Sequence, residues 1–358
     1  MLYREAGQFK TSYEADQAVF PILQDRIGIV LILLAAVVAP FVFSDFFVAS
    51  ILVPLLVLSL ATIGLNVLTG YAGQISLGTG AFMGVGAYAA YKLTTIFPDV
   101  NIIVHILLSG AFAAGIGVVF GLPSLRIKGL YLVVTTLAAQ FFLEWCFIRI
   151  PWLYNYNDSG AIQVPRREAF GIVVTGPTAT PTVQYFVCLA IVVVMTLLVK
   201  NLIRGRIGRQ WMMIRDMDIA AELMGVRPLF AKLSAFAVSS YLCGVAGAMF
   251  VFLYLGAAEP SAFSITLSFQ VLFMCIIGGL GSLIGSFFGA AFIWVFPIML
   301  RTLLPELGLD IGSEAIFHIA QIVVGALIIV FLIVEPHGLA RLWALGKEKL
   351  RAWPFPYA

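Results

Sequence analysis

Charged residues are scarce in this chain. Only 11% of its 358 residues are Asp, Glu, Lys or Arg, whereas 61% are hydrophobic and the mean hydropathy is +1.04. Soluble domains contain about 25% charged residues. Uncharged runs reach 46 residues between Asp45 and Lys92 and 41 between Glu259 and Arg301, and a helix needs about 20 apolar residues to cross a bilayer. The sequence therefore predicts an all-α, polytopic integral membrane protein.

Several chemical motifs are also absent. The four cysteines lie in apolar runs without a CxxC pair, which predicts buried free thiols rather than disulfides or a metal site. No phosphate-binding loop is present, so ATP hydrolysis by this chain alone is excluded. No nucleophile–base or metal-ligand pattern suggests an enzyme or a bound cofactor. The small net charge of +3 gives no sign of nucleic-acid binding. The amino-terminal segment mixes acidic and basic residues, unlike a cleavable signal peptide.

About ten transmembrane helices are expected, which places both termini on one side of the membrane. The predicted spans are residues 27–44, 48–69, 77–97, 102–122, 129–149, 182–200, 232–255, 266–281, 284–303 and 315–334. Placing the loop at 201–231 inside leaves 16 Lys and Arg residues inside and 5 outside. Because basic residues concentrate on the cytoplasmic side, both termini are predicted to be cytoplasmic.

These spans divide the chain into a transmembrane domain and two tails. The tails are residues 1–26 and 336–358, both predicted to be cytoplasmic, and the transmembrane domain is 27–335. The longest predicted periplasmic loop, 151–181, is rich in Pro, Gly, Tyr and Asn. It is either a docking or gating surface or an ordered connector.

A glycine-rich polar stretch, Gly64–Gly80, interrupts the 46-residue uncharged run. Irregular backbone at membrane depth is tolerated where protein or a water-filled cavity covers it, and broken helices often supply substrate sites in transporters. The alternative is close helix packing through small residues, followed by an inner turn. A second glycine cluster, Gly278–Gly285, also joins two predicted spans. The candidate pathway residues are Asn66, Gly70, Tyr71, Gly73, Gln74, Ser76, Thr135 and Thr136.

The loop between Lys200 and Lys232 carries seven basic residues and a short amphipathic segment. Within it, Ile214, Met217, Ala221 and Met224 recur at helical spacing and predict one apolar face. Gly225 is expected to end this helix. A helix of this kind either docks in a groove of a partner and transmits its motion, or rests on the bilayer interface.

Parts of the chain resemble a known family. Ala220-Ala221-x-x-x-Gly225 resembles the "EAA" coupling motif of ABC-importer permeases, with Ile219 where that motif has Glu. Residues 64–78, 125–137, 208–225 and 278–289 resemble the branched-chain amino acid permease family. The resemblance assigns ATPase coupling to one short stretch of the loop. Its candidate residues are Arg215, Asp218, Ile219, Ala220, Ala221, Glu222 and Gly225.

The resemblance implies a bacterial inner-membrane importer that works by alternating access. This subunit would pair with a homologous second permease, two cytoplasmic ATP-binding subunits and a periplasmic substrate-binding protein. ATP and Mg²⁺ would be used by the partner ATPases, with no cofactor bound by this chain. The expected substrates are branched-chain or similar aliphatic amino acids. Two alternatives stay open: an ABC permease of the same type for urea or short amides, and an ion-coupled secondary carrier. No chain of acidic residues or histidines in the membrane suggests proton coupling.

Overall fold

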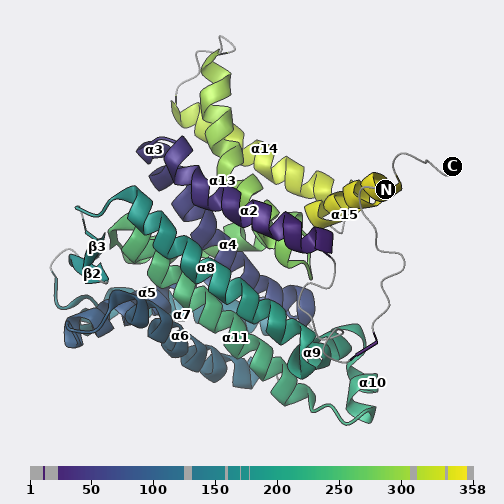
Figure 1. Ribbon diagram of the computed structural model, residues 1–358. Helices are drawn as coiled ribbons and strands as arrows, with labels where there is room; N and C mark the ends of the chain where they lie inside the picture. The colour runs from purple at the N-terminus through teal and green to yellow at the C-terminus, as the bar shows by residue number, and fades with distance from the viewer. Residues whose placement is uncertain are drawn as a thin grey trace.

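The computed structural model describes residues 11–12, 23–124, 131–157, 160–169, 171–176, 178–306, 313–334 and 338–352. Long helices lie side by side and make up most of this part of the chain (Figure 1). The helical elements are α2 (Leu23–Val42), α3 (Asp45–Phe47), η1 (Val48–Leu52), α4 (Val53–Asn66), η2 (Val67–Tyr71), α5 (Thr79–Ile96), α6 (Ile102–Ser124), α7 (Tyr131–Arg149), η3 (Pro151–Tyr154), α8 (Pro181–Arg204), α9 (Arg206–Asp216), α10 (Asp218–Leu223), α11 (Pro228–Met249), η4 (Phe250–Leu255), η5 (Pro260–Phe263), α12 (Ile265–Gly278), α13 (Leu283–Glu306), α14 (Ser313–Val334) and α15 (Gly338–Ala352).

Seven helical segments of the described chain are long and apolar enough to cross a membrane. They are Asp45–Tyr71, Ile102–Leu122, Leu132–Arg149, Pro181–Arg204, Pro228–Leu255, Pro260–Gly278 and Leu283–Leu300. Two shorter apolar stretches, Arg26–Val42 and Gln321–Val330, lie within α2 and α14. The all-α polytopic architecture is thus confirmed, whereas the expected number of ten crossings is not. α5 is long enough, but its glycines, hydroxyl residues and Lys92 make it less apolar than the other spans.

α11 lies at the centre of the helical bundle. In its span, 83% of the most apolar window is buried, against 28% for the α7 span, which exposes one face. Small residues let the central helices approach closely. A Cβ at Gly86 of α5 would overlap the backbone of Gly244 in α11, and one at Gly247 would overlap the backbone of Met83. The core therefore forms where α4, α5, α6 and α11 pack together.

The described chain has two short antiparallel strand pairs, and the pair labelled in Figure 1 lies at the end of the bundle away from α9. In the first, β1 (Ile162–Gln163) pairs with β4 (Ala257–Ala258), which follows η4 at the end of α11. In the second, β2 (Arg167–Ala169) pairs with β3 (Ile172–Thr175). The predicted outer loop is therefore tied to the end of the central helix through β1 and β4.

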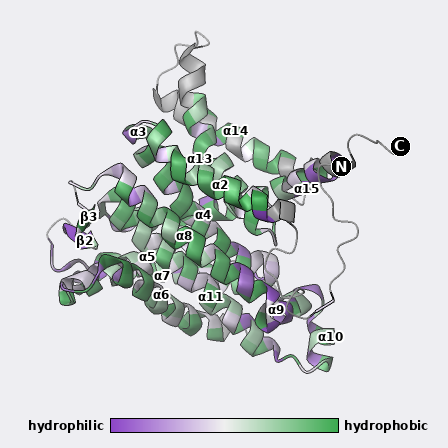
Figure 2. Cartoon of the chain, viewed as in Figure 1, coloured by the Kyte–Doolittle hydropathy of each residue, from purple (hydrophilic) through white to green (hydrophobic). Residues whose placement is uncertain are grey.

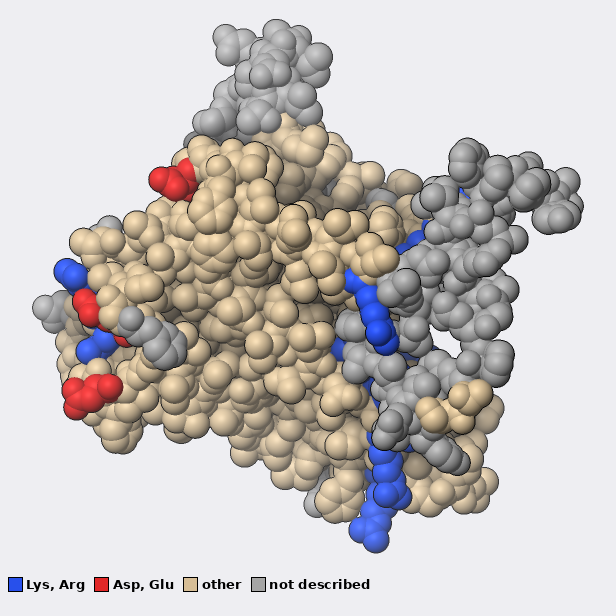
Figure 3. Space-filling view, in the orientation of Figure 1, with Lys and Arg blue, Asp and Glu red and all other residues tan. Residues whose placement is uncertain are grey.

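Hydrophilic and charged residues are distributed unequally between the two ends of the bundle. Hydrophobic residues cover the middle of the helices, and hydrophilic residues gather around α9 (Figure 2). On the face drawn in Figure 3, Lys and Arg side chains form a stripe at the α9 end, whereas the visible Asp and Glu lie toward the opposite end, next to a few further basic side chains. This arrangement agrees with the charge asymmetry that predicts a cytoplasmic α9. The orientation of the chain in a bilayer stays a prediction.

Candidate functional site: the basic loop and two helix breaks

The predicted amphipathic helix of the basic loop consists of two helices, α9 and α10. Met217 separates them in an extended conformation, with φ −160° and ψ 96°. The expected apolar face is therefore wrong in part. Ile214 and Ala221 are buried, but Met217 and Met224 are 66% and 64% exposed. The extended residue turns α10 relative to α9, so the four side chains do not share one face.

α9 is held firmly against the membrane helices. The Trp211 side chain is fully buried, and its Nε1 donates a hydrogen bond to Ser234 Oγ of α11 at 2.9 Å. A Cβ at Gly208 would overlap the backbone of Ile203 in α8. α9 therefore packs closely against α8 and α11.

α10, in contrast, exposes apolar side chains on the face directed away from the helical bundle. Ala221 is its buried residue, whereas Ile219 and Leu223 are 66% and 86% exposed. Asp218 and Ala220 are half-buried, and Glu222 is exposed. Gly225 ends the segment with a φ of +86°, a left-handed conformation that favours glycine. A shallow cavity of about 380 Å³ follows, lined by Glu222 and residues 225–230.

Arg215, at the end of α9, contacts the first helix break, which is the segment between α4 and α5 (residues 67–78). Its Nη1 donates a hydrogen bond to the carbonyl oxygen of Gly70 in η2 at 2.8 Å. Its Nε and Nη2 both lie 2.9 Å from Asp216 Oδ1. The guanidinium therefore contacts the membrane domain on one side and its neighbouring carboxylate on the other.

Asn66, the last residue of α4, connects the first helix break to the second, which is the turn between α12 and α13 (residues 279–282). The side chain is fully buried. Asn66 Oδ1 accepts a hydrogen bond from the Gly281 amide at 2.8 Å, and Nδ2 donates to Ser282 O and Ser286 Oγ, both at 2.9 Å. The two glycine clusters of the sequence thus meet in space, although Asn66 and Gly281 are 215 residues apart.

Close approach at this meeting point depends on glycine. A Cβ at Gly70 would overlap both Asn66 Oδ1 and the Gly281 nitrogen. Gly281 itself has a φ of +79°, and a Cβ there would lie 3.5 Å from Arg215 Nη1. Arg215, Gly70, Asn66 and Gly281 therefore form one contact set, which we call the break junction.

A second group of hydrogen bonds fixes the start of α5 after the break. The Leu77 amide donates to Thr136 Oγ1 of α7 at 3.1 Å. Gln140 of α7 and Ser268 of α12 accept from the two amides that follow Thr79. The distances are 2.8 Å from Gly80 N to Ser268 Oγ and 2.8 Å from Ala81 N to Gln140 Oε1. The Gln140 Nε2 donates to Phe263 O at 2.7 Å, and the Ser268 hydroxyl donates to Gln140 Oε1 at 2.9 Å.

The remaining candidate pathway residues occupy different environments. Tyr71, Gln74 and Ser76 are buried, whereas Gly73 is exposed and Thr135 is half-buried. Within the part of the chain that the structure describes, neither amide atom of Gln74 has a hydrogen-bond partner, and the same holds for the buried Thr69 hydroxyl. Buried polar groups usually have partners, so these two side chains stand out among the polar residues of the first helix break.

Sequence reasoning missed Gln140, Ser268, Ser282 and Ser286. Each is a neutral polar residue in an apolar stretch, and such residues must find hydrogen-bond partners when buried. The sequence therefore predicts that these side chains are hydrogen-bonded. It does not predict that their partners lie at or next to the two helix breaks.

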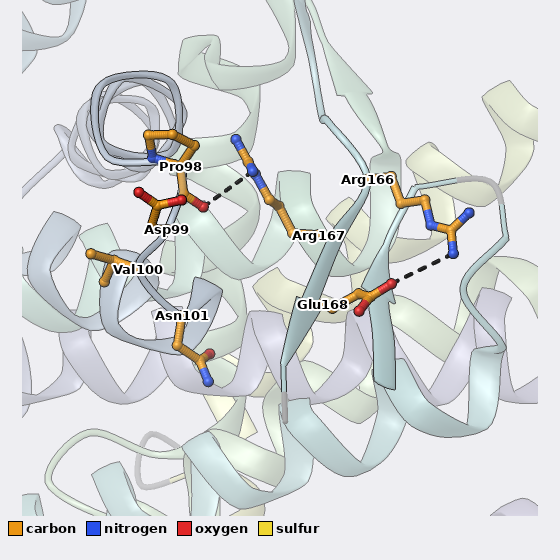
Figure 4. Close-up of a pocket in the computed structure, with 7 residues that line it drawn as sticks. All are labelled: Pro98, Asp99, Val100, Asn101, Arg166, Arg167 and Glu168. Atoms are coloured by element: carbon orange, nitrogen blue, oxygen red, sulfur yellow. Dashed lines mark hydrogen bonds and ion pairs between the residues drawn. The ribbon is translucent and has the colours of Figure 1, made fainter. Parts of the chain in front are cut away.

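At the opposite end, the predicted outer loop holds the end of α5. Arg167 donates from Nη2 to Thr94 O at 2.9 Å and from Nη1 to Pro98 O at 3.2 Å. Lys92 Nζ donates to Asn155 Oδ1 and lies 4.4 Å from the centre of the Trp152 ring. A cavity of about 500 Å³ lies here, lined by Pro98, Asp99, Val100, Asn101, Arg166, Arg167 and Glu168 (Figure 4).

Comparison with known proteins identifies the family. A family model described as "Branched-chain amino acid transport system / permease component" matches residues 47–332, which is most of the chain. The chain therefore belongs to this family of membrane transport permeases.

Two relatives carry the same description. Over 342 residues the chain is 28% identical to the high-affinity branched-chain amino acid transport system permease protein LivM of Escherichia coli (strain K12), covering 88% of this chain and 75% of the relative. It is also 28% identical over 300 residues to LivM of Salmonella typhimurium (strain LT2), covering 77% and 66%. No solved structure matches.

Family membership defines the class of protein. The chain is a multi-pass membrane protein and a transport subunit, and the family and both relatives are described for branched-chain amino acids rather than for urea or amides.

Proposed function

We propose that this chain is a permease subunit of an ATP-driven importer for branched-chain or similar aliphatic amino acids in a bacterial inner membrane. It pairs with a homologous second permease, two cytoplasmic ATP-binding subunits and a periplasmic substrate-binding protein. ATP and Mg²⁺ act in the ATP-binding subunits. The observation that carries this proposal is the loop at 201–231, which we call the coupling loop. In it α10, which exposes apolar side chains, follows α9, which packs against the membrane helices.

The apolar surface of α10 is the proposed contact with the ATPase. Ile219 and Leu223 are large, apolar and mostly exposed, and an amphipathic helix that lays such residues into a groove is a common mode of recognition. Asp218 and Glu222 flank this surface and would meet basic groups of the partner. Ile219 supplies apolar contact at the position where the motif of the wider class has a carboxylate.

The pathway is proposed to run along the first helix break. Gln74 and Thr69 support this, because their buried polar atoms have no partner among the described residues. A bound amino acid offers an ammonium and a carboxylate, which the amide and the hydroxyl can both contact. Opening alternately to each side would require α5 to move relative to η2.

The coupling assignment is tested by recovering the complex from its native membrane. Wild-type chain, solubilised in detergent, should bring down two ATP-binding subunits and a second permease, as read by mass spectrometry. Leu223→Arg should lose the ATP-binding subunits and keep the second permease. Asn201→Arg adds the same charge at an exposed position at the end of α8 and serves as the control.

Leu223 is chosen over Ala221 because Ala221 is fully buried. An arginine at Ala221 would displace α10 itself and would confuse misfolding with lost docking. Recovery of the wild-type chain without any ATP-binding subunit would contradict the proposal. It would favour an ion-coupled carrier, which predicts uptake by the purified chain alone in liposomes with an ion gradient.

The substrate class is tested by uptake into cells that lack this chain and express it again from a plasmid. Radiolabelled leucine should enter only when the chain is present, and labelled urea should enter equally with and without it. Restored uptake of urea but not leucine would reassign the substrate and leave the ATP-driven mechanism intact.

A further inference from the structure

We propose that Arg215 is the positioning residue that passes movement of the coupling loop to both helix breaks at once. This inference rests on the proposed function and assigns a role within it. The sequence pattern places Arg215 beside the residues that face the ATPase, but in the structure its Nη1 hydrogen-bonds Gly70 in the membrane domain. α10 would receive the push, and Arg215 would transmit it.

The first part of the argument is the acceptor. Gly70 lies in η2, where the chain leaves its helix, and the last carbonyls of a helix lack partners within it. The main-chain N–H of Gln74, a few residues on, donates to Leu68 O at 3.0 Å rather than to Gly70 O. Arg215 supplies the donor that Gly70 O needs, and hydrogen bonds to a charged group are stronger than neutral ones.

The second part is the geometry of the guanidinium. Asp216 holds Nε and Nη2 from the solvent side, and Nη1 remains directed toward Gly70. The fork of an arginine can make both contacts with one fixed plane, which a lysine ammonium cannot. The Gly73 position, where a Cβ would lie 3.4 Å from Arg215 Cα, brings a second point of the break against the same residue.

The third part is the connection to the other break. Gly70 packs against Asn66 and Gly281 so closely that no side chain fits. Asn66 in turn holds Gly281, Ser282 and Ser286 by hydrogen bonds. A displacement of Gly70 by Arg215 therefore moves the α12–α13 turn together with η2. Because α9 is fixed to α8 and α11, Arg215 moves with those helices when the loop is pushed.

The test compares Arg215→Gln, Arg215→Lys and the control Arg209→Gln in the assembled complex in liposomes. Arg209 is exposed on the same helix, so its replacement removes the same charge without touching the break junction. Both leucine uptake and ATP hydrolysis are measured. For Arg215→Gln, uptake per ATP hydrolysed should fall by about tenfold, the size expected for one hydrogen bond to a charged group. Arg215→Lys should fall between this variant and the wild type, and Arg209→Gln should match the wild type.

A second readout separates transmission from a structural role. Ile75, a 44% exposed residue of the first helix break, is replaced by cysteine as a reporter that reacts with a water-soluble maleimide. The labelling rate should change when ATP and vanadate are added to complexes with wild-type Arg215. In Arg215→Gln complexes that still contain the ATP-binding subunits, the rate should stay unchanged by nucleotide.

The outcomes are distinguishable from failure of the proposed function. If wild-type complexes contain no ATP-binding subunits, the proposed function fails. If wild-type complexes assemble and transport, and Arg215→Gln keeps both the uptake ratio and the nucleotide-dependent labelling, the role assigned to Arg215 is wrong while the proposed function stands.

Discussion

Replacing Asn66 with alanine should destabilise the membrane domain, because this side chain holds the two helix breaks together. Its amide is fully buried and makes three hydrogen bonds of 2.8 to 2.9 Å across the break junction. Alanine removes the acceptor for the Gly281 main-chain amide. Ser282 O keeps two donors, the Ser286 main-chain amide at 3.2 Å and the Ser286 hydroxyl at 3.3 Å, so neither Ser282 O nor that hydroxyl is left without a partner.

The magnitude follows from the Gly281 main-chain amide, which loses the acceptor it has in the wild type. A buried donor or acceptor left unsatisfied costs about 1–3 kcal/mol. One such group predicts a loss of about 1–3 kcal/mol in the free energy of unfolding. Water entering the space left by the amide would move the value toward the lower end of this range.

The assay is SDS-induced unfolding of the purified chain in mixed micelles, followed by tryptophan fluorescence. Trp211, fully buried against α11, should report the loss of the native packing. The matched control is Asn201→Ala, an exposed asparagine in the last turn of α8. Alanine there should change stability by less than about 0.7 kcal/mol, through helix propensity alone.

An Asn66→Ala variant as stable as the Asn201→Ala control would refute the reasoning. If that stable variant also lost leucine uptake while its complex stayed assembled, Asn66 would act in the substrate pathway. Loss of stability together with loss of uptake is the result expected from the structure.

Three further changes test other contacts. Gly70→Ala should destabilise the chain strongly, because no room exists for a Cβ, whereas Gly115→Ala, with open space around it, should leave the SDS unfolding midpoint unchanged or slightly raised. Gln140→Leu removes three buried hydrogen bonds, to Ala81 of α5, Phe263 of η5 and Ser268 of α12, and should cost about 2–5 kcal/mol in the same assay. An unchanged midpoint would show that these bonds do not contribute to stability. Trp211→Phe leaves one hydrogen bond to Ser234 unmade and should cost about 1 kcal/mol, measured by thermal unfolding, while the chain still recovers its ATP-binding subunits.

Much of the helical architecture follows from the sequence, because apolar runs bounded by charges are what a membrane-spanning helix requires. The spans expected at 182–200 and 284–303 correspond to α8 (Pro181–Arg204) and α13 (Leu283–Glu306). The number of crossings was harder to predict. α5 carries glycines, hydroxyl residues and Lys92, and local composition cannot say how much of this polarity the neighbouring helices cover.

The break junction could not be predicted in the same way. Glycine-rich stretches at Gly64–Gly80 and Gly278–Gly285 indicate irregular backbone, but their contact joins residues more than 200 positions apart. The division between α9 and α10 was missed because one extended residue, Met217, causes it. Methionine is common in helices, so nothing in the residue type announces the break.

The pairing of β1 with β4 attaches the predicted outer loop to the C-terminal end of the central helix, α11. From Pro228, next to α10, α11 runs for 22 residues to Met249, or about 33 Å at 1.5 Å per residue. η4 continues it as a π-helix to Leu255, just before β4. If this continuous helical segment tilts as one body, both of its ends change position together. Any molecule that binds the outer strands more tightly in one tilt must itself be bound more tightly when the inner end is held in that tilt, because coupling between two sites is reciprocal.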